Sequence, residues 1–167
     1  MPDVKRVAAT LLAVVVLLAA GCDSGDDTGS STTTIPGGAD PAKVVVIDDW
    51  AKALTAGDID RAASYFAIPS LTQNAGPKYE IADEGQARSF NASLPCGAIL
   101  VEAHPSDRFV IATFRLTERP GPGTCGDGVG HKALTAFEIN DDGKISQWLR
   151  VVASPGQSGP NAPGTSI

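Results

Sequence analysis

The hydrophobic period of the chain changes near Gly97, and this change constrains the fold more than any other feature of the sequence. Between residues 42 and 94, apolar side chains recur every three or four positions, which is typical of amphipathic helices. From residue 97 onward they alternate with polar side chains, which is typical of half-buried strands. Helices followed by antiparallel strands predict an α+β fold in which the sheet buries its apolar face against N-terminal helices.

The helical half also contains the signals that begin and end helices. Gly57 is placed to end the first helix, because glycine enters the left-handed cap conformation at little cost. Asp58 can accept the free backbone N–H groups at the start of the next helix. The elements expected here are a helix over residues 42–56, a second helix that Asp58 caps and Pro69 ends, a short strand at 79–81 and a third helix over 83–94.

The second half predicts an antiparallel meander. In the strand over residues 109–117, one face carries Val110, Ala112, Phe114 and Leu116. For the last strand the sequence does not decide which face points to the core. One face carries Ile145, Leu149 and Val151, and the other carries Trp148 and Val152. The expected elements are strands at 98–103, 109–117, 131–140 and 144–152, a turn at 104–107, a Gly/Pro-rich loop at 120–130 and a turn at 140–143.

The N-terminus has the pattern of a secretory signal. Lys5 and Arg6 precede an unbroken apolar run of 14 residues, from 7 to 20. A membrane-spanning helix needs about 20 apolar residues, so the run is too short to be a comfortable one. It continues into Leu18-Ala19-Ala20-Gly21-Cys22, which resembles the lipobox of bacterial lipoproteins, although that family prefers leucine where this chain has Ala19. The resemblance implies that a diacylglycerol modifies Cys22 and anchors the chain to the cell membrane, facing the extracytoplasmic side.

These features divide the chain into four expected parts. Residues 22–41 are rich in Asp, Gly, Ser and Thr, which cannot bury enough apolar surface to fold. Asp23 resembles an inner-membrane retention signal, which has meaning only in a bacterium with two membranes, so the choice of membrane stays open. The parts are a signal peptide at 1–21, the lipidated cysteine and a disordered tether at 22–41, an α+β domain at 42–153 and a disordered tail at 154–167.

The charge of the chain excludes one class of partner. Thirteen Lys and Arg residues stand against 19 Asp and Glu residues, which gives a formal net charge of −6. A nucleic-acid-binding domain of this size normally shows a basic surplus or a basic run, and the chain has neither. We therefore expect no nucleic acid partner.

The two cysteines that remain after Cys22 is lipidated form an even pair. In an oxidising compartment such a pair predicts a disulfide, here between Cys96 and Cys125. The alternative is a metal site in which His104 and His131 join the two cysteines. Structural zinc sites usually present closely spaced ligand pairs, and the nearest spacings here are wider. We expect the disulfide, with no metal and no cofactor.

Two segments of the domain resemble nuclear transport factor 2-like domains, also described as SnoaL-like or cystatin-like. The opening run is Trp50-Ala51-Lys52-Ala53-Leu54-Thr55-Ala56-Gly57-Asp58-Ile59-Asp60, which leads to Tyr65-Phe66. The closing hairpin is Phe137-Glu138-Ile139-Asn140-Asp141-Asp142-Gly143-Lys144-Ile145, followed by Trp148. The resemblance implies a sheet wrapped around a long helix into a cone with a central pocket. Members include isomerases, dehydratases, epoxide hydrolases and non-enzymatic binding or dimerisation modules, so the fold alone does not decide the function.

The sequence favours binding over catalysis. Ketosteroid-isomerase-like members carry a catalytic aspartate just after the second helix, where this chain has Ile68-Pro69-Ser70-Leu71. We therefore expect a cone that binds a small apolar ligand or a protein partner, with a homodimer as a further candidate, and assign no catalytic residue. The alternative is an isomerase or dehydratase that uses Tyr65 with Glu138 or a histidine. Arg115, Glu138 and Arg150 are expected to form cross-strand charge pairs on the solvent face. The candidate pocket residues are Trp50, Tyr65, Phe66, Phe114, Phe137 and Trp148.

Overall fold

The computed structural model describes residues 35–152. The expected signal peptide, Cys22, most of the tether and the tail lie outside the described residues. Among the helices that the structure describes, none is both long and apolar enough to cross a membrane.

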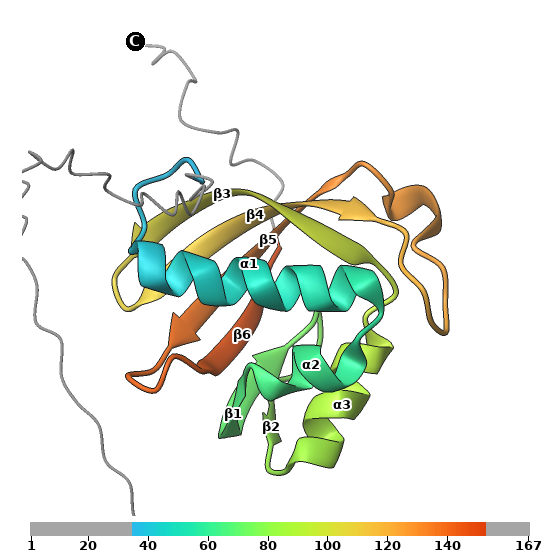
Figure 1. Ribbon diagram of the computed structural model, residues 1–167, viewed down its shortest axis with the longest axis horizontal. Helices are drawn as coiled ribbons and strands as arrows, with labels where there is room; N and C mark the ends of the chain where they lie inside the picture. Colours follow the sequence, from blue (N-terminus) through green and yellow to red (C-terminus); the bar gives the residue numbers. More distant parts are fainter. Residues whose placement is uncertain (1–34, 153–167) are drawn as a thin grey trace, which may run out of the picture. The chain divides into compact units, whose positions relative to one another are not determined.

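A six-stranded sheet forms one layer of the domain (Figure 1). The strands lie in the order β2-β1-β6-β5-β4-β3. Neighbouring strands are antiparallel except β1 and β6, which are parallel. The strands are β1 (Phe66–Gln73), β2 (Tyr79–Ile81), β3 (Gly97–Ser106), β4 (Phe109–Thr117), β5 (Lys132–Ile139) and β6 (Ile145–Val151).

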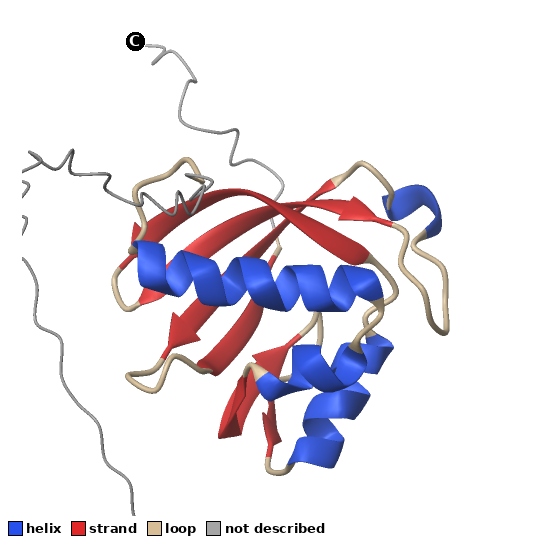
Figure 2. Cartoon of the chain, viewed as in Figure 1, coloured by secondary structure: helices blue, strands red, loops and turns tan. Residues whose placement is uncertain are grey.

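Three helices, α1 (Pro41–Ala56), α2 (Ile59–Ser64) and α3 (Glu84–Ser93), lie on one side of this sheet (Figure 2). The Asp58 carboxylate accepts the backbone N–H of Arg61, as the sequence predicts, and Asp83 caps α3 in the same way. Gly57 ends α1 in the left-handed conformation, with φ of +75°. The fold is therefore α+β with N-terminal helices packed on a mixed, mostly antiparallel sheet, and the prediction of the fold class is confirmed.

The strand β1 is absent from the sequence prediction. The second helix ends at Ser64 rather than at Pro69, and Pro69 lies inside β1. Proline removes a backbone donor, which argues against a strand in sequence reading. Here β6 pairs with Phe66 and then with residues 71–73, and β2 pairs with residues 70–72, so Pro69 faces no ladder partner.

The strand β3 is longer than predicted. It continues through His104 and Pro105 to Ser106, and the turn that follows contains Asp107, with φ of +50°. A proline is tolerated there because β3 is the edge strand of the sheet.

Residues 35–41, which the sequence assigns to the tether, belong to the folded domain. The Ala103 N–H donates to the Pro36 carbonyl at 2.9 Å, and Ile35 packs against the core. Gly37 is required at its position, because a Cβ atom there would lie 2.1 Å from the Ala103 carbonyl oxygen. The domain therefore begins about seven residues earlier than the sequence suggests.

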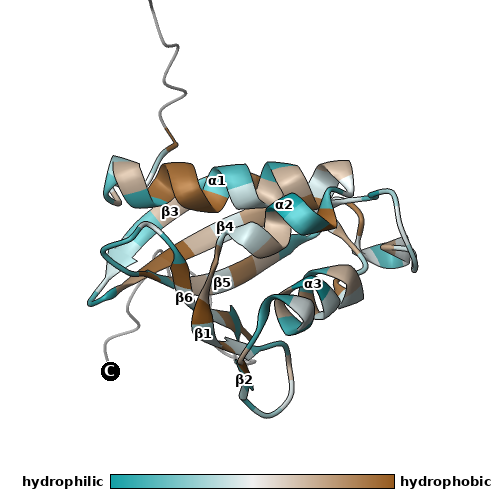
Figure 3. Ribbon diagram, turned by 60° about the horizontal axis from the view of Figure 1, so that its bottom comes forward, coloured by the Kyte–Doolittle hydropathy of each residue, from teal (hydrophilic) through white to brown (hydrophobic). Residues whose placement is uncertain are grey.

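Four aromatic side chains form the centre of the core between α1 and the sheet. The Trp50 ring meets the rings of Phe114, Phe137 and Trp148 edge-on, at centroid distances of 6.0, 5.4 and 6.3 Å. This geometry is the favourable one for aromatic pairs. Figure 3 shows apolar residues along the strands that face α1.

The inward face of β6, which the sequence leaves open, is set by an irregularity in the pairing. Ile139 pairs with Ile145 and Glu138 pairs with Gln147, so Ser146 is an extra residue between them. Such a bulge changes which side chains share a face. Ile145 and Trp148 are therefore both buried, and Leu149 points to the outer face of the sheet.

Candidate functional site

A cavity of about 360 Å³ opens between the C-terminal half of α1 and the inner face of the sheet. Its floor is aromatic, because Trp50, Phe114 and Trp148 all contribute to it. The loop between α3 and β3 and the turn after β1 supply the remaining walls. The other lining residues are Leu54, Asn74, Ala75, Leu94, Pro95, Cys96, Ala98, Leu116, Ala133, Thr135, Arg150 and Val152.

The chemistry of this lining is mostly apolar. Asn74 and Thr135 supply neutral polar groups, and Arg150 is the one charged side chain among the described residues that line the cavity. Arg150 pairs in register with Thr135, which is buried on the inner face of β5. Because alternate residues of a strand point to opposite faces, Arg150 lies on the same face of β6 as Trp148.

The structure brings three of the six candidate pocket residues together in this cavity: Trp50, Phe114 and Trp148. Phe137 is fully buried in the core behind Trp50, away from the cavity lining. Phe66 packs against Phe90 and lines a separate, more polar hollow near α2. Tyr65 caps the C-terminus of α2 and lines no part of the main cavity.

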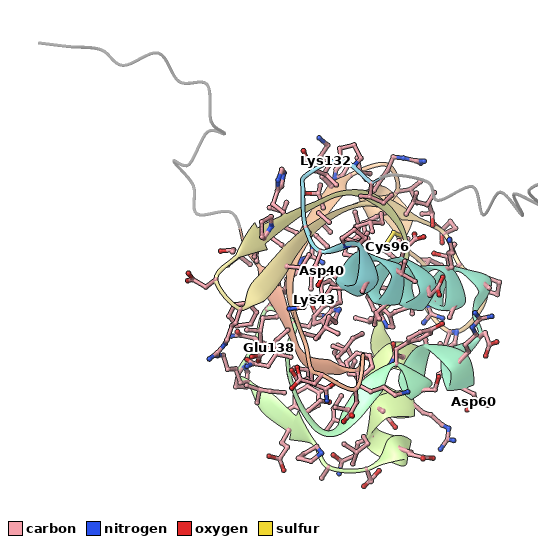
Figure 4. All side chains as sticks on the ribbon, turned by 60° about the vertical axis from the view of Figure 1, so that its left-hand side comes forward. Asp40, Lys43, Asp60, Cys96, Lys132 and Glu138 are labelled. Carbon is pink, nitrogen blue, oxygen red and sulfur yellow. A yellow bond between two sulfur atoms is a disulfide. The ribbon has the colours of Figure 1, made fainter. Side chains whose placement is uncertain are left out.

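The residues of the enzymatic alternative lie elsewhere. Glu138 lies on the outer face of β5, where it pairs with Arg108 at 3.4 Å and accepts a hydrogen bond from Gln147. His104 lies in the exposed edge strand, close to Glu102, and His131 is exposed just before β5. Figure 4 labels Lys132 and Glu138 near the two ends of β5. None of these side chains lines the cavity.

The prediction that Arg115, Glu138 and Arg150 form cross-strand charge pairs is wrong. Arg115 lies opposite Lys132 in the register of β4 and β5, which places two cations side by side on the outer face. Glu138 pairs instead with Arg108 from the turn before β4. Arg150 points to the other face of the sheet, because the bulge at Ser146 shifts the phase of β6.

The predicted disulfide is present in the structure. Cys96 and Cys125 are bonded, with 2.07 Å between the sulfurs, and Cys96 forms part of the cavity wall. The Glu118 carboxylate accepts the backbone N–H groups of Cys125 and Gly126, which fixes the loop that carries the second cysteine. Within residues 35–152, no three His, Cys, Asp or Glu side chains are grouped to hold a metal ion.

Two buried polar residues that the sequence analysis missed support the same wall. The Arg119 guanidinium donates to the carbonyls of Leu94 at 2.8 Å, Ala92 at 3.0 Å and Asn91 at 3.4 Å, at the end of α3. Burial lowers the pKa of Arg119 from its ordinary value. The indole N–H of Trp50 donates to Oδ1 of Asn91 at 2.9 Å. Together these bonds join α3 and its following loop to α1 and the aromatic floor.

The comparisons with known proteins agree with this architecture. No protein-family model matches the sequence, and no curated protein matches it. An NTF2-like protein of unknown function from Cytophaga hutchinsonii matches the structure with a TM-score of 0.51 at 9% identity, covering 71% of this chain and 91% of its own. A candidate ketosteroid isomerase from Kribbella flavida matches with a TM-score of 0.50 at 12% identity, covering 75% and 90%.

A cystatin-fold protein from Novosphingobium aromaticivorans matches with a TM-score of 0.49 at 18% identity, covering 66% of this chain and 97% of its own. Likeness at these identities shows the fold alone. The domain therefore has the nuclear transport factor 2-like fold, a sheet curved around a long helix.

Proposed function

We propose that the domain binds a small, predominantly apolar molecule in the cavity and does not catalyse a reaction on it. The observation that carries the proposal is the cavity itself, about 360 Å³ in volume with an aromatic floor. Ligand pockets are typically 300–1,000 Å³ and lined mainly by apolar and aromatic side chains, with few polar groups. This cavity has that size and that composition.

The lining supports binding over catalysis. General acid–base chemistry needs a group that gains or loses a proton near neutral pH. Among the described lining residues the only ionisable side chain is Arg150, and an arginine guanidinium stays protonated in proteins. Tyr65, Glu138 and both histidines, the residues of the enzymatic alternative, lie outside the lining. The candidate isomerase among the structural neighbours shares the fold at 12% identity and lends no catalytic residue.

Binding of a neutral apolar probe tests this proposal. Trp50 and Trp148 are the only two tryptophans of the chain, and both line the cavity. Fluorescence energy transfer from tryptophan to N-phenyl-1-naphthylamine therefore reports a probe bound to the domain. We expect saturable transfer at one probe per chain.

Two small-to-large variants on β5 locate the bound probe. Ala133→Leu fills the cavity and should weaken binding at least tenfold, whereas Ala136→Leu, on the outer face of the same strand, should leave it within about twofold. Circular dichroism checks that both variants fold. No saturable transfer with the parent protein, or equal binding by Ala133→Leu and Ala136→Leu, would overturn the proposal.

We further propose that a lipid on Cys22 holds this domain at the extracytoplasmic face of the membrane. The support is the basic pair, the apolar run of 14 residues and the small residues before Cys22, together with a disulfide of the kind that persists in oxidising compartments. In a bacterial host fed a radiolabelled fatty acid, the full chain should incorporate the label and sediment with membranes. Cys22→Ser should do neither, and labelling that survives this substitution would contradict the proposal.

A further inference from the structure

The cavity holds a cation that has no ionic partner within residues 35–152. Arg150 is half-buried in a lining that is otherwise neutral, and no carboxylate of the described residues lies within 4 Å of its guanidinium. Among the described arginines, Arg88 contacts Asp60 at 2.7 Å and Arg108 contacts Glu138 at 3.4 Å, whereas Arg115 is unpaired but exposed on the outer face, so what distinguishes Arg150 is its place in the cavity. The chain also has an acidic surplus, with a formal net charge of −6, so carboxylates are not scarce.

The Trp148 ring belongs to the same cavity lining as Arg150. Its indole N–H is buried away from the cavity, so the ring offers a ligand its apolar surface rather than a donor. Arg150 and Trp148 are two residues apart on one face of β6, so a single ligand can contact the guanidinium and the ring together.

We propose, as a refinement that rests on the proposed function, that the ligand is a small amphipathic anion. Its acidic group, a carboxylate or a chemically similar oxyanion, pairs with the Arg150 guanidinium. Its apolar body lies against Trp50, Phe114 and Trp148. A planar guanidinium can hold a carboxylate through two parallel hydrogen bonds, which sets the orientation of the ligand as well as its charge.

The volume limits the size of this anion. At about 360 Å³ the cavity is near the lower end of the range for ligand pockets. It accommodates an apolar body of one or two rings or a short acyl chain, and a membrane lipid with two long chains does not fit. The proposed ligand is therefore a free small acid rather than a lipid of the bilayer.

The test uses two probes that differ only in charge. 8-Anilinonaphthalene-1-sulfonate carries one sulfonate, and N-phenyl-1-naphthylamine is the same ring system without it. We expect the purified protein to bind the anionic probe about tenfold or more tightly than the neutral one, as charge-assisted hydrogen bonds require. Energy transfer from Trp50 and Trp148 reports both probes.

Matched variants assign the effect to one side chain. Arg150→Gln should abolish the preference for the anionic probe, so that the two affinities differ by less than about twofold. Arg115→Gln removes the same charge from the outer face of β4 and should change neither affinity. Both variants are checked for folding by circular dichroism, and the comparison of the two probes on the parent protein needs no variant.

The outcomes separate this inference from the proposed function. If the neutral probe binds in the cavity but the parent protein shows no preference for the anionic probe, the refinement is wrong and the proposed function stands. The same conclusion follows if Arg150→Gln keeps the preference or if Arg115→Gln loses it equally. If neither probe shows saturable transfer, both the refinement and the proposed function are overturned.

Discussion

At the scale of single residues, Arg119 is the side chain on which the cavity wall most depends. It is 8% exposed, and its guanidinium bonds four backbone carbonyls, including that of Pro120 at 3.0 Å. Three of these carbonyls, those of Asn91, Ala92 and Leu94, lie at the end of α3, where an α-helix leaves backbone acceptors without internal partners. Arg119 therefore closes α3 and fixes the loop that continues to Cys96.

Replacing this guanidinium should destabilise the domain. Arg119→Gln leaves several buried carbonyls without donors, so we expect the free energy of unfolding to fall by about 2–4 kcal/mol. Arg115→Gln, at an exposed position of β4, should change it by less than about 0.5 kcal/mol. Urea titration monitored by tryptophan fluorescence measures both variants. An Arg119→Gln variant as stable as Arg115→Gln would show that α3 does not need this cap.

The roles of such residues are hidden in the sequence. Trp50 and Asn91 are 41 positions apart, and Arg119 reaches back 25 positions to Leu94. No local period or motif links residues at these separations, and an arginine beside a Gly/Pro-rich loop resembles a solvated one. The sequence can name buried aromatic residues such as Trp50 and Phe114, but it does not separate those that line the cavity from Phe137, which lies in the core. The prediction for Arg150 gives the wrong face because the bulge at Ser146 has no sequence signal.

At the scale of elements, the disulfide joins the start of β3 to the loop between β4 and β5. The bond encloses a loop of about 30 residues, from Cys96 to Cys125. Closing a loop of that length in the unfolded chain accounts for about 3.5 kcal/mol in the chain-entropy description. The double variant Cys96→Ser, Cys125→Ser should lose about this much stability in urea titration.

A reduction experiment controls for the substitutions themselves. Reducing the parent protein should give the same loss as the double variant, and reductant should not affect the double variant further. A double variant as stable as the oxidised protein would mean that β3 and the loop are held by their other contacts, such as those of Glu118.

The elements that the sequence predicts well are those with local signals. The end of α1 and the start of α2 follow from Gly57 and Asp58, which act within one turn of the helix. The strand β1 has no such signal, because Pro69 interrupts it and its partner β6 lies more than 70 positions later. Pairing between β1 and β6 depends on the assembled sheet, so the sequence of β1 alone does not indicate that this segment is a strand.

At the scale of the molecule, one architecture accounts for the cavity. The sheet curves around α1, and the aromatic centre fills the space between them as far as Trp50 and Trp148. Beyond these rings the inner face continues to Ala133 and Arg150, and the space left between it, the C-terminal half of α1 and the loop after α3 is the cavity. The order of helices and strands predicts this architecture. The position of the cavity depends instead on where α1 ends and on where the disulfide holds the loop that carries Cys96.

The central claim is that an apolar molecule occupies this cavity rather than the outer face of the sheet. The most direct measurement is isotope-filtered NMR of the ¹³C-labelled protein with unlabelled N-phenyl-1-naphthylamine. Methyl groups of Leu54, Leu116 and Ala133 line the cavity, and those of Ile99, Leu134 and Val151 lie on the outer face. We predict intermolecular nuclear Overhauser effects to the first three methyl-bearing residues and none to the second three. Effects confined to Ile99, Leu134 and Val151 would contradict the claim and assign the binding surface to the outer face.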